Sequence, residues 1–293
     1  MRLSLPQYRF TLPPRKGYLG IMANGCMIDA HIHSSVSFDS DTPMRDMALA
    51  SIEKGVEGIC FTDHYDVIDS GGKFVPEYDW SFAHAAHDEA KKAVGEGFML
   101  NFGLELGNAP AGFSAAEGSL NEPDIDFVLG SIHNASARLA YKDYYYVDYT
   151  SEELCYFYLD DYFSQLEQLV AWGRFDSLAH VPYPLRYMVE RDKQPITLER
   201  YYERIDAMLL HLARNDKALE VNTGKTGRIM PEYPYLLERF HALGGKLVTV
   251  GTDAHSIAQT GLGLKGAYEL LKQKGFSSVA CFKRRKPEMI RIE

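Results

Sequence analysis

The sequence predicts an α/β fold, a barrel in which parallel strands alternate with helices. Seven short apolar runs, each of strand length and rich in Val, Ile, Leu or Phe, recur along the chain. Helix signals lie between several of them, and six of the seven runs end in a histidine or a carboxylate. Repeated strand–helix–strand units imply parallel strands with right-handed crossovers. A closed or nearly closed barrel is favoured, and an open doubly wound sheet is the alternative, because periodicity does not separate the two.

The strands and helices follow from these patterns in chain order. The expected strands are the runs 27–33, 56–64, 98–105, 126–133, 175–180, 218–223 and 246–255. A capping box formed by Thr150 and Glu153 begins a long helix that reaches about Trp172. Further helices are expected at 197–215, 232–243 and 262–274. The connection 134–150 carries five tyrosines in seventeen residues, which favours either a self-packed surface loop or a lid.

Composition limits the class of protein. With 293 residues, 46% hydrophobic and 24% charged, the chain fits one barrel domain over 27–293, preceded by an extension of uncertain order at 1–26. A net charge of −9 argues against a broad nucleic-acid-binding surface. Four scattered cysteines without a CxxC pair suit a reducing cytosol. No run reaches the roughly 20 apolar residues of a membrane span, so a cytoplasmic protein is expected.

Metal-competent side chains at the strand ends are the main functional signal. They are His31 and His33, His64, Glu105, His133, His180, and Asp253 with His255. Residues i and i+2 of a strand point to the same side, so each spaced pair can serve one site. Because active sites of parallel α/β folds lie at the carboxyl ends of strands, these side chains are expected to converge.

A metal site explains this pattern better than structural histidines do. A single strand-end histidine is more often a hydrogen-bonded structural residue, and the four helix-borne histidines, His84, His87, His211 and His241, are interpreted as surface or packing residues. The other six all fall at strand ends, where clustering without a metal would be costly. Imidazole and carboxylate ligands suit Zn, Mn or Fe. Their number predicts two or three ions, suited to phosphoryl transfer and also compatible with acyl or amide hydrolysis.

The order of these motifs resembles the PHP (polymerase and histidinol phosphatase) superfamily. HxH at 31–33, FTDH at 61–64 and TDAH at 252–255, with the Glu and two His between them, carry the resemblance over about residues 27–280. The stretches 31–64 and 220–256 are similar to the histidinol-phosphatase branch. The resemblance implies a distorted (β/α)7 TIM-like barrel with a trinuclear metal centre at the carboxyl ends of its strands.

The resemblance also implies a ligand set. One ion would take His31, His33, Glu105 and Asp253. A second would take Glu105, His133 and His180, with Glu105 bridging. The third would take Asp39, His64 and His255, where Asp41 is an alternative to Asp39.

Several polar residues are candidates for the substrate and the surrounding shell. The resemblance assigns Arg186 to the substrate phosphate, with a solvated surface arginine as the alternative. Lys225 and Arg228 are weaker substrate-binding candidates. Asp63 is expected either to orient a ligand or to cap a turn. The cluster 283–286 (KRRK) is expected to be solvated surface.

These expectations define a function. They predict hydrolysis of a small phosphate ester, L-histidinol phosphate, in histidine biosynthesis, with Arg186 and Asp253 as catalytic candidates. A phosphoesterase of the same superfamily that acts on nucleotides or oligonucleotides is the alternative. A non-catalytic metal-binding barrel is disfavoured, because all nine ligand positions are filled. No extended nucleic acid or membrane partner is expected, and nothing in the sequence indicates the oligomeric state.

Overall fold

The computed structural model describes residues 26–76 and 78–292. The strands in these ranges are β1 (Ile28–Ile32), β2 (Gly58–Phe61), β3 (His64–Asp66), β4 (Met99–Gly107), β5 (Phe127–Ser131), β6 (Ser177–Leu178), β7 (Ala218–Asn222), β8 (Val248–Gly251), β9 (Ser278–Lys283) and β10 (Lys286–Arg291). The α-helices are α1 (Met44–Glu53), α2 (Trp80–Val94), α3 (Phe113–Ser119), α4 (Glu152–Trp172), α5 (Tyr202–Arg214), α6 (Tyr233–Ala242) and α7 (Leu264–Gln273). The expected extension 1–26 lies outside the described residues except for Cys26, which is buried.

The predicted barrel is confirmed. Its strands are parallel and follow the order β1-β2-β4-β5-β6-β7-β8, with β3 paired to β4 beside that path. The two ends of this order meet, because the Asp253 N–H donates to the His31 carbonyl at 2.8 Å and the His33 N–H donates to the Ala254 carbonyl at 2.9 Å. These bonds exclude the open sheet.

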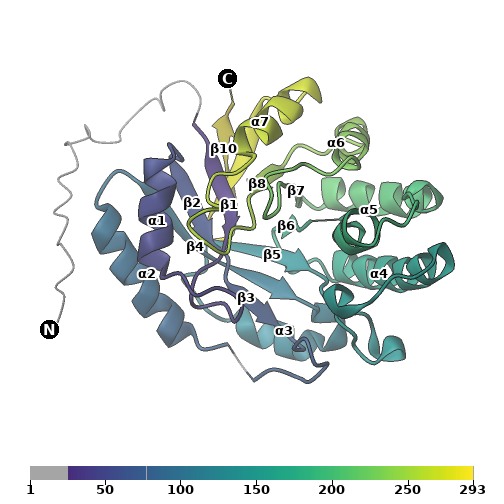
Figure 1. Ribbon diagram of the computed structural model, residues 1–293. Coiled ribbons are helices and arrows are strands. Elements are labelled where there is room, and N and C mark those ends of the chain that lie inside the picture. The colour runs from purple at the N-terminus through teal and green to yellow at the C-terminus, as the bar shows by residue number, and fades with distance from the viewer. Residues whose placement is uncertain (1–25, 77, 293) are drawn as a thin grey trace, which may run out of the picture.

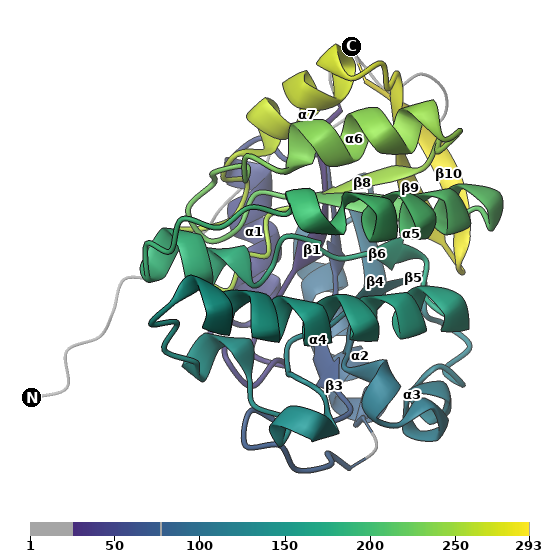
Figure 2. The same ribbon diagram turned by 90° about the vertical axis from the view of Figure 1, so that its right-hand side faces the viewer.

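Helices cover the outside of the barrel. Figure 1 shows α1 and α2 on one flank of the strands and α4 to α6 on the opposite flank. Figure 2 shows α4, α5 and α6 lying side by side. Between helices and barrel, apolar side chains form one large core, which explains why the central strands are buried along their whole length. None of the helices within 26–76 and 78–292 is long and apolar enough to cross a membrane.

Several predicted elements differ in their bounds, and two of these differences have a clear cause. The run 56–64 contains part of two strands, because the nine-residue β4 is long enough to pair with β2 at one end and with β3 at the other. In the β3 pairing, His64 lies opposite Glu105. Helix α4 begins one residue later than expected, since the Ser151 hydroxyl, not that of Thr150, accepts the Leu154 N–H at 3.3 Å.

The β9–β10 hairpin closes the amino-terminal end of the barrel. Ala280 and Phe282 of β9 pack against Ala30, Cys60, Phe127 and other side chains inside the barrel. The expectation that 283–286 is a solvated cluster holds for the exposed residues Lys283, Arg284 and Lys286, whereas Arg285 is partly buried. Lys283 Nζ lies 3.3 Å from Asp126 Oδ2, and the Arg285 guanidinium binds Asp176. These buried aspartates precede β5 and β6, so the hairpin is attached at the end opposite to the predicted site.

Candidate metal centre

Strand ends bring all nine predicted ligands to one end of the barrel. His31 and Glu105 belong to β1 and β4, and His64 begins β3. The remaining ligands follow strands or lie in a loop: His33 after β1, Asp39 before α1, His133 after β5, His180 after β6, and Asp253 and His255 after β8. Eight of the nine side chains are at most 9% exposed, and that of Asp39 is 32% exposed. The convergence expected from strand polarity is therefore observed.

Glu105 lies at the centre of this cluster. Its Oε1 lies 2.8 Å from His180 Nε2 and 3.1 Å from His133 Nε2. Its Oε2 has three imidazole neighbours: His31 Nε2 at 3.1 Å, His33 Nε2 at 3.3 Å and His64 Nδ1 at 3.1 Å. One carboxylate thus contacts five imidazoles, with its two oxygens directed toward different groups of rings.

Asp253 links the histidine pair of β1 to an arginine. Its Oδ1 lies 3.3 Å from His33 Nε2 and 3.6 Å from His31 Nε2. Its Oδ2 accepts a hydrogen bond from Arg186 Nη1 at 2.9 Å. The carboxylate therefore faces the cluster with one oxygen and the arginine with the other.

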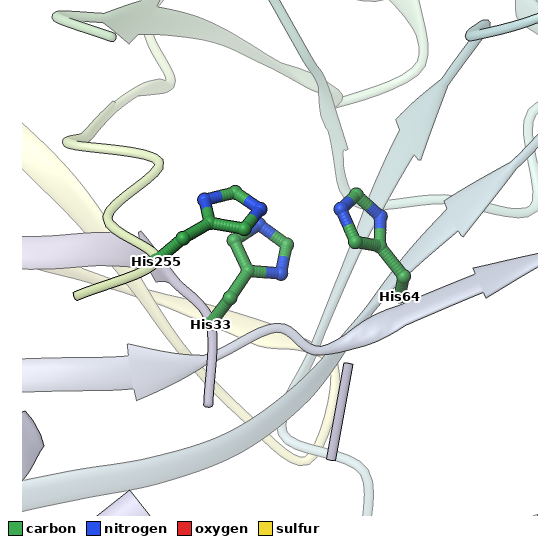
Figure 3. Close-up of side chains that lie close together, drawn as sticks. All are labelled: His33, His64 and His255. Atoms are coloured by element: carbon green, nitrogen blue, oxygen red, sulfur yellow. The ribbon is translucent and has the colours of Figure 1, made fainter. Parts of the chain in front are cut away.

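A third group lies nearer the solvent. Figure 3 shows His33, His64 and His255 close together; the His33 ring centroid lies 4.2 Å from that of His64 and 4.1 Å from that of His255. Asp39 Oδ2 lies 2.9 Å from His255 Nε2, and its Oδ1 lies 3.7 Å from His64 Nε2. These contacts identify Asp39 as the aspartate of this loop that faces the histidines, whereas Asp41 is exposed.

Buried acceptors fix the orientation of the imidazoles. His31 Nδ1 lies 2.6 Å from Glu220 Oε1, and His133 Nδ1 lies 3.0 Å from Asp66 Oδ1. His255 Nδ1 lies 2.8 Å from the backbone oxygen of Asp253. An imidazole that donates through Nδ1 presents the Nε2 lone pair on its other side, which is the usual arrangement for a metal-ligating histidine.

Asp63 supports the cluster through serine hydroxyls. Its carboxylate accepts the Ser34 N–H at 2.6 Å and the Ser37 hydroxyl at 2.7 Å. Because Ser37 gives its proton to Asp63, its oxygen can accept from His33 Nδ1 at 3.1 Å. Of the two expected roles, the orienting one matches this geometry.

The lone pairs of the cluster fit cations. His31 Nε2 and His33 Nε2 are 3.0 Å apart, and both rings are oriented to donate through Nδ1. Two facing lone pairs at this distance require a proton or a metal ion beside them. His64 Nδ1 is buried without a hydrogen bond of good geometry, although a carboxylate oxygen is near. Such an atom is explained by a bound cation.

Three groups of ligand atoms lie close enough to hold an ion. They are His31, His33, Glu105 and Asp253; His64, Glu105 and His133; and His33, His64 and His255. The first equals the expected group. The second contains His64 in place of His180, which nevertheless contacts Glu105, and the third contains His33 in place of Asp39.

Burial and charge shift the pKa values of the cluster. Burial alone would raise the pKa of Glu105, but the surrounding histidines hold it well below its usual range. For His33, burial lowers the pKa, yet Asp253 and Glu105 raise it to about 9. Burial and the neighbouring His33 keep the pKa of His64 well below its usual range. The carboxylates are thus charged at neutral pH, as ligation requires.

Two of the predicted ligands have a left-handed backbone. His180 has φ 28° and Asp253 has φ 56°, values that cost free energy in residues other than glycine. The costs are offset by fixed contacts: the His180 N–H donates to Glu220 Oε2 at 2.9 Å, and the Asp253 N–H donates across the barrel seam. Strained backbone at these two positions is typical of a functional site.

Sequence reasoning missed Glu220 and Asp66. Glu220 is 1% exposed in β7 and holds both the His31 ring and the His180 backbone. Asp66 is 8% exposed and holds the His133 ring. A signal existed for Glu220, since a carboxylate within the apolar run ALEVNT has no place in a core without a partner.

A cavity of about 320 Å³ opens over the cluster. Arg186, the first residue of the π-helical segment η4 (Arg186–Arg191), lines it. Its guanidinium donates to Asp253 and, at 2.7 Å, to Asn222 Oδ1, and it lies 5.4 Å from the Tyr183 ring centroid. The predicted arginine therefore faces the cavity.

The other two substrate-binding candidates differ in position. Lys225 lines the same cavity, with Nζ 4.0 Å from Asp39 Oδ2. Arg228 is exposed and is absent from the residues that line the cavity.

The tyrosine-rich connection reaches the cavity. Tyr145 and Tyr146 of the 3-10 turn η3 (Tyr144–Tyr146) line it while their side chains remain about half exposed. Tyr144 and Tyr149, in contrast, are buried in the core. The loop is thus both self-packed and part of the cavity wall. Arg191 of η4 donates to the backbone oxygens of Tyr145 and Val147, which ties the loop to the segment that carries Arg186.

Known proteins are similar to this chain in sequence or in fold. Histidinol-phosphatase from Lactococcus lactis is 31% identical, with 87% of this chain and 94% of that protein covered. A Thermotoga maritima relative is 30% identical, with 87% of this chain and 95% of that protein covered. The crystal structure of Lactococcus lactis histidinol phosphate phosphatase complexed with Zn, L-histidinol and phosphate superposes with a TM-score of 0.74 at 27% identity, covering 89% of this chain and 98% of that one.

A second solved structure and a family model agree. A structure from Listeria monocytogenes, 16% identical, shares the fold with a TM-score of 0.65 over 82% of this chain and 99% of that one. The PHP domain model matches residues 29–224, a range that holds seven of the nine converging side chains. The chain belongs to the PHP domain family.

Proposed function

We propose that this protein is a metal-dependent phosphoric monoester hydrolase that converts L-histidinol phosphate and water to L-histidinol and phosphate, a step of histidine biosynthesis. The observation that carries the proposal is that a cluster of imidazoles and carboxylates suited to cations shares one cavity with a partly buried arginine. Arg186 contacts Asp253, which itself faces His31 and His33. An anion in this cavity would lie between the Arg186 guanidinium and the cations bound by the cluster. The similarity to histidinol phosphatases over almost nine tenths of the chain supports this substrate.

Two or three divalent ions, Zn, Mn or Fe, would be held by the nine side chains. Glu105 would bridge, because its two oxygens face different rings. The expected sets are His31, His33, Glu105 and Asp253; Glu105, His133 and His180; and Asp39, His64 and His255. The six imidazoles of the cluster support these metals over Ca or Mg, which prefer oxygen ligands.

Bound divalent ions would supply charge stabilisation for the phosphoryl oxygens and lower the pKa of coordinated water. The side chains of the protein would bind and orient the phosphate group. The planar guanidinium of Arg186, held by Asp253 and Asn222, presents its remaining N–H groups to the cavity for a bidentate grip on phosphate. The pKa of Asp253 is held well below its usual range, so this carboxylate is charged. It lies between the Arg186 guanidinium and the histidines, where it can hold the N–H groups of Arg186 in place.

Tyr145 and Tyr146 would cover the leaving group. Both line the cavity, and their backbone is held by Arg191 from the Arg186 segment. An aromatic wall beside the phosphate position suits the imidazole of histidinol. Lys225 would add a mobile positive charge at the rim, where its side chain is 52% exposed.

The test is phosphate release by the purified protein reconstituted with Zn, Mn or Fe. L-Histidinol phosphate is compared with nucleoside monophosphates, a short oligonucleotide and phenyl phosphate, and His31→Ala serves as the inactive control. The proposal predicts the highest kcat/KM for L-histidinol phosphate. Hydrolysis of nucleotides alone would keep the metal site and overturn the substrate.

A further inference from the structure

Four carboxylates line the cavity above the metal cluster, and three of them already have partners. Asp39 contacts His255, Asp66 contacts His133, and Asp253 contacts Arg186. The fourth is Asp143, which lines the same cavity. Among the described residues it forms no ion pair with a histidine, lysine or arginine.

One oxygen of Asp143 has a structural role and the other remains available. Oδ1 accepts the Tyr145 N–H at 2.8 Å and so caps the η3 turn. In the described part of the chain, Oδ2 receives no hydrogen bond. The carboxyl is only partly exposed, and burial raises its pKa. His133 and Lys142 act on this carboxylate from beyond ion-pair distance, so its Oδ2 is available to a cationic group of a ligand in the cavity.

The backbone fixes Asp143 next to a predicted metal ligand. Asp143 and Asn134 form an antiparallel bridge, and Asn134 directly follows His133. The next residue, Tyr144, donates its N–H to the His133 carbonyl at 3.1 Å. Residues opposite one another in such a bridge are about 5 Å apart. The carboxylate therefore lies within the length of a small substrate from the metal cluster.

We propose that Asp143 is the binding site for a primary ammonium group of the substrate. The inference rests on the proposed function and deepens it. In L-histidinol phosphate the amino group is on the carbon next to the ester methylene, and it is protonated at neutral pH. With the phosphate held by the metal cluster and Arg186, the ammonium lies a few bonds away and meets Asp143. The protein thus selects amino-alcohol phosphates over phosphate esters that lack the amino group.

The same residue links substrate binding to the tyrosine wall. Because Asp143 caps the turn that carries Tyr145 and Tyr146, replacing it with alanine would disturb both the charge and the turn. Asp143→Asn keeps an acceptor oxygen for the Tyr145 N–H and removes only the charge. Asp148→Asn is a matched control, since Asp148 is an exposed acid of the same loop that is absent from the cavity lining.

The experiment measures kcat/KM for L-histidinol phosphate and for 3-(imidazol-4-yl)propyl phosphate, which lacks the amino group. A charge-assisted hydrogen bond is worth a factor of about 10 to 100. The unmodified protein is expected to prefer the amine by that factor. Asp143→Asn is expected to lose this preference: its kcat/KM should fall about tenfold more for L-histidinol phosphate than for the amine-free ester. Asp148→Asn is expected to retain the preference. Equal losses on both esters would overturn the inference.

A binding measurement separates this inference from the proposed function. Calorimetry compares L-histidinol with 4-(3-hydroxypropyl)imidazole, both without turnover. Tighter binding of L-histidinol that disappears in Asp143→Asn supports the ammonium site, and equal binding of the two alcohols to the unmodified protein overturns it. Hydrolysis of phenyl phosphate without hydrolysis of L-histidinol phosphate overturns the proposed substrate instead.

Discussion

The Nδ1 atom of His31 lies 2.6 Å from Oε1 of Glu220, and both side chains are almost wholly buried. Glu220 also accepts the His180 N–H through its other oxygen. A single carboxylate from the middle of β7 thus orients two predicted metal ligands from different strands.

Replacing Glu220 with glutamine should weaken metal binding. The amide keeps the size of the side chain but has one acceptor oxygen for two donors, so one of the two ligands loses its support. Loss of such a partner lowers metal affinity by about 10- to 100-fold. Competition with a chromophoric chelator measures the effect, and Glu203→Gln on the exposed face of α5 is the control. Unchanged affinity in Glu220→Gln would show that the contact is dispensable.

Metal binding should release protons at neutral pH. In the metal-free protein, carboxylate neighbours raise the pKa of His33 to about 9 and the pKa values of His31 and His133 well above their usual range. These imidazoles therefore hold protons at pH 7.5 that a metal must displace. The affinity should rise as the pH increases toward 9.

Calorimetry in buffers of different ionisation enthalpy measures this release. The apparent enthalpy of Zn binding at pH 7.5 is expected to change with the buffer, by an amount equivalent to one or more protons. An enthalpy independent of the buffer contradicts the prediction.

Arg186→Lys should lower kcat/KM for the phosphate ester by roughly 100-fold, because an ammonium cannot replace the fork of N–H groups that binds Asp253, Asn222 and phosphate together. Steady-state kinetics after metal loading measures it. Arg228→Gln is the comparison, since that exposed side chain lies off the cavity lining and its loss should change kcat/KM less than about twofold. A similar loss of kcat/KM in both variants would contradict a specific role of Arg186 in phosphate binding.

The hairpin contact at the other end of the barrel should affect stability and not activity. Arg285→Ala leaves Asp176 buried without its partner, which should lower the free energy of unfolding by about 1–3 kcal/mol given the partial exposure of the arginine. Urea denaturation measures this, with Arg284→Ala as the neighbouring control. The kcat/KM of both variants is expected to match that of the unmodified protein, because the hairpin lies far from the cavity.

The convergence of these side chains was predictable because histidines and carboxylates are uncommon at the ends of apolar strands. His31, His133 and His180 each follow or end an apolar run, and strand polarity then requires that they meet. The grouping of the side chains was less predictable: His33 and His64 each belong to more than one group of nearby ligand atoms, because their rings are stacked at 4.2 Å.

The supporting residues depend on three-dimensional contacts that no local pattern encodes. Asp66 lies 67 positions from His133 in the sequence, and only the pairing of β3 with β4 brings them together. The left-handed backbone of His180 and Asp253 is likewise imposed by tertiary hydrogen bonds. The hairpin was not predicted, because no local pattern shows that Lys283 and Arg285 form ion pairs with the buried aspartates Asp126 and Asp176.

The closure of the barrel has a consequence for assembly. The first and last strands of the barrel meet where Asp29 accepts hydrogen bonds from Thr252, 223 positions along the chain, and where the backbones of His31 and Asp253 pair. An ion shared by His31 and Asp253 would act as a crosslink that turns most of the chain into a ring, and crosslinks that close long loops restrict the unfolded state most. A growing chain cannot complete this ring until β8 has been made, so capture of this shared ion would come late in folding.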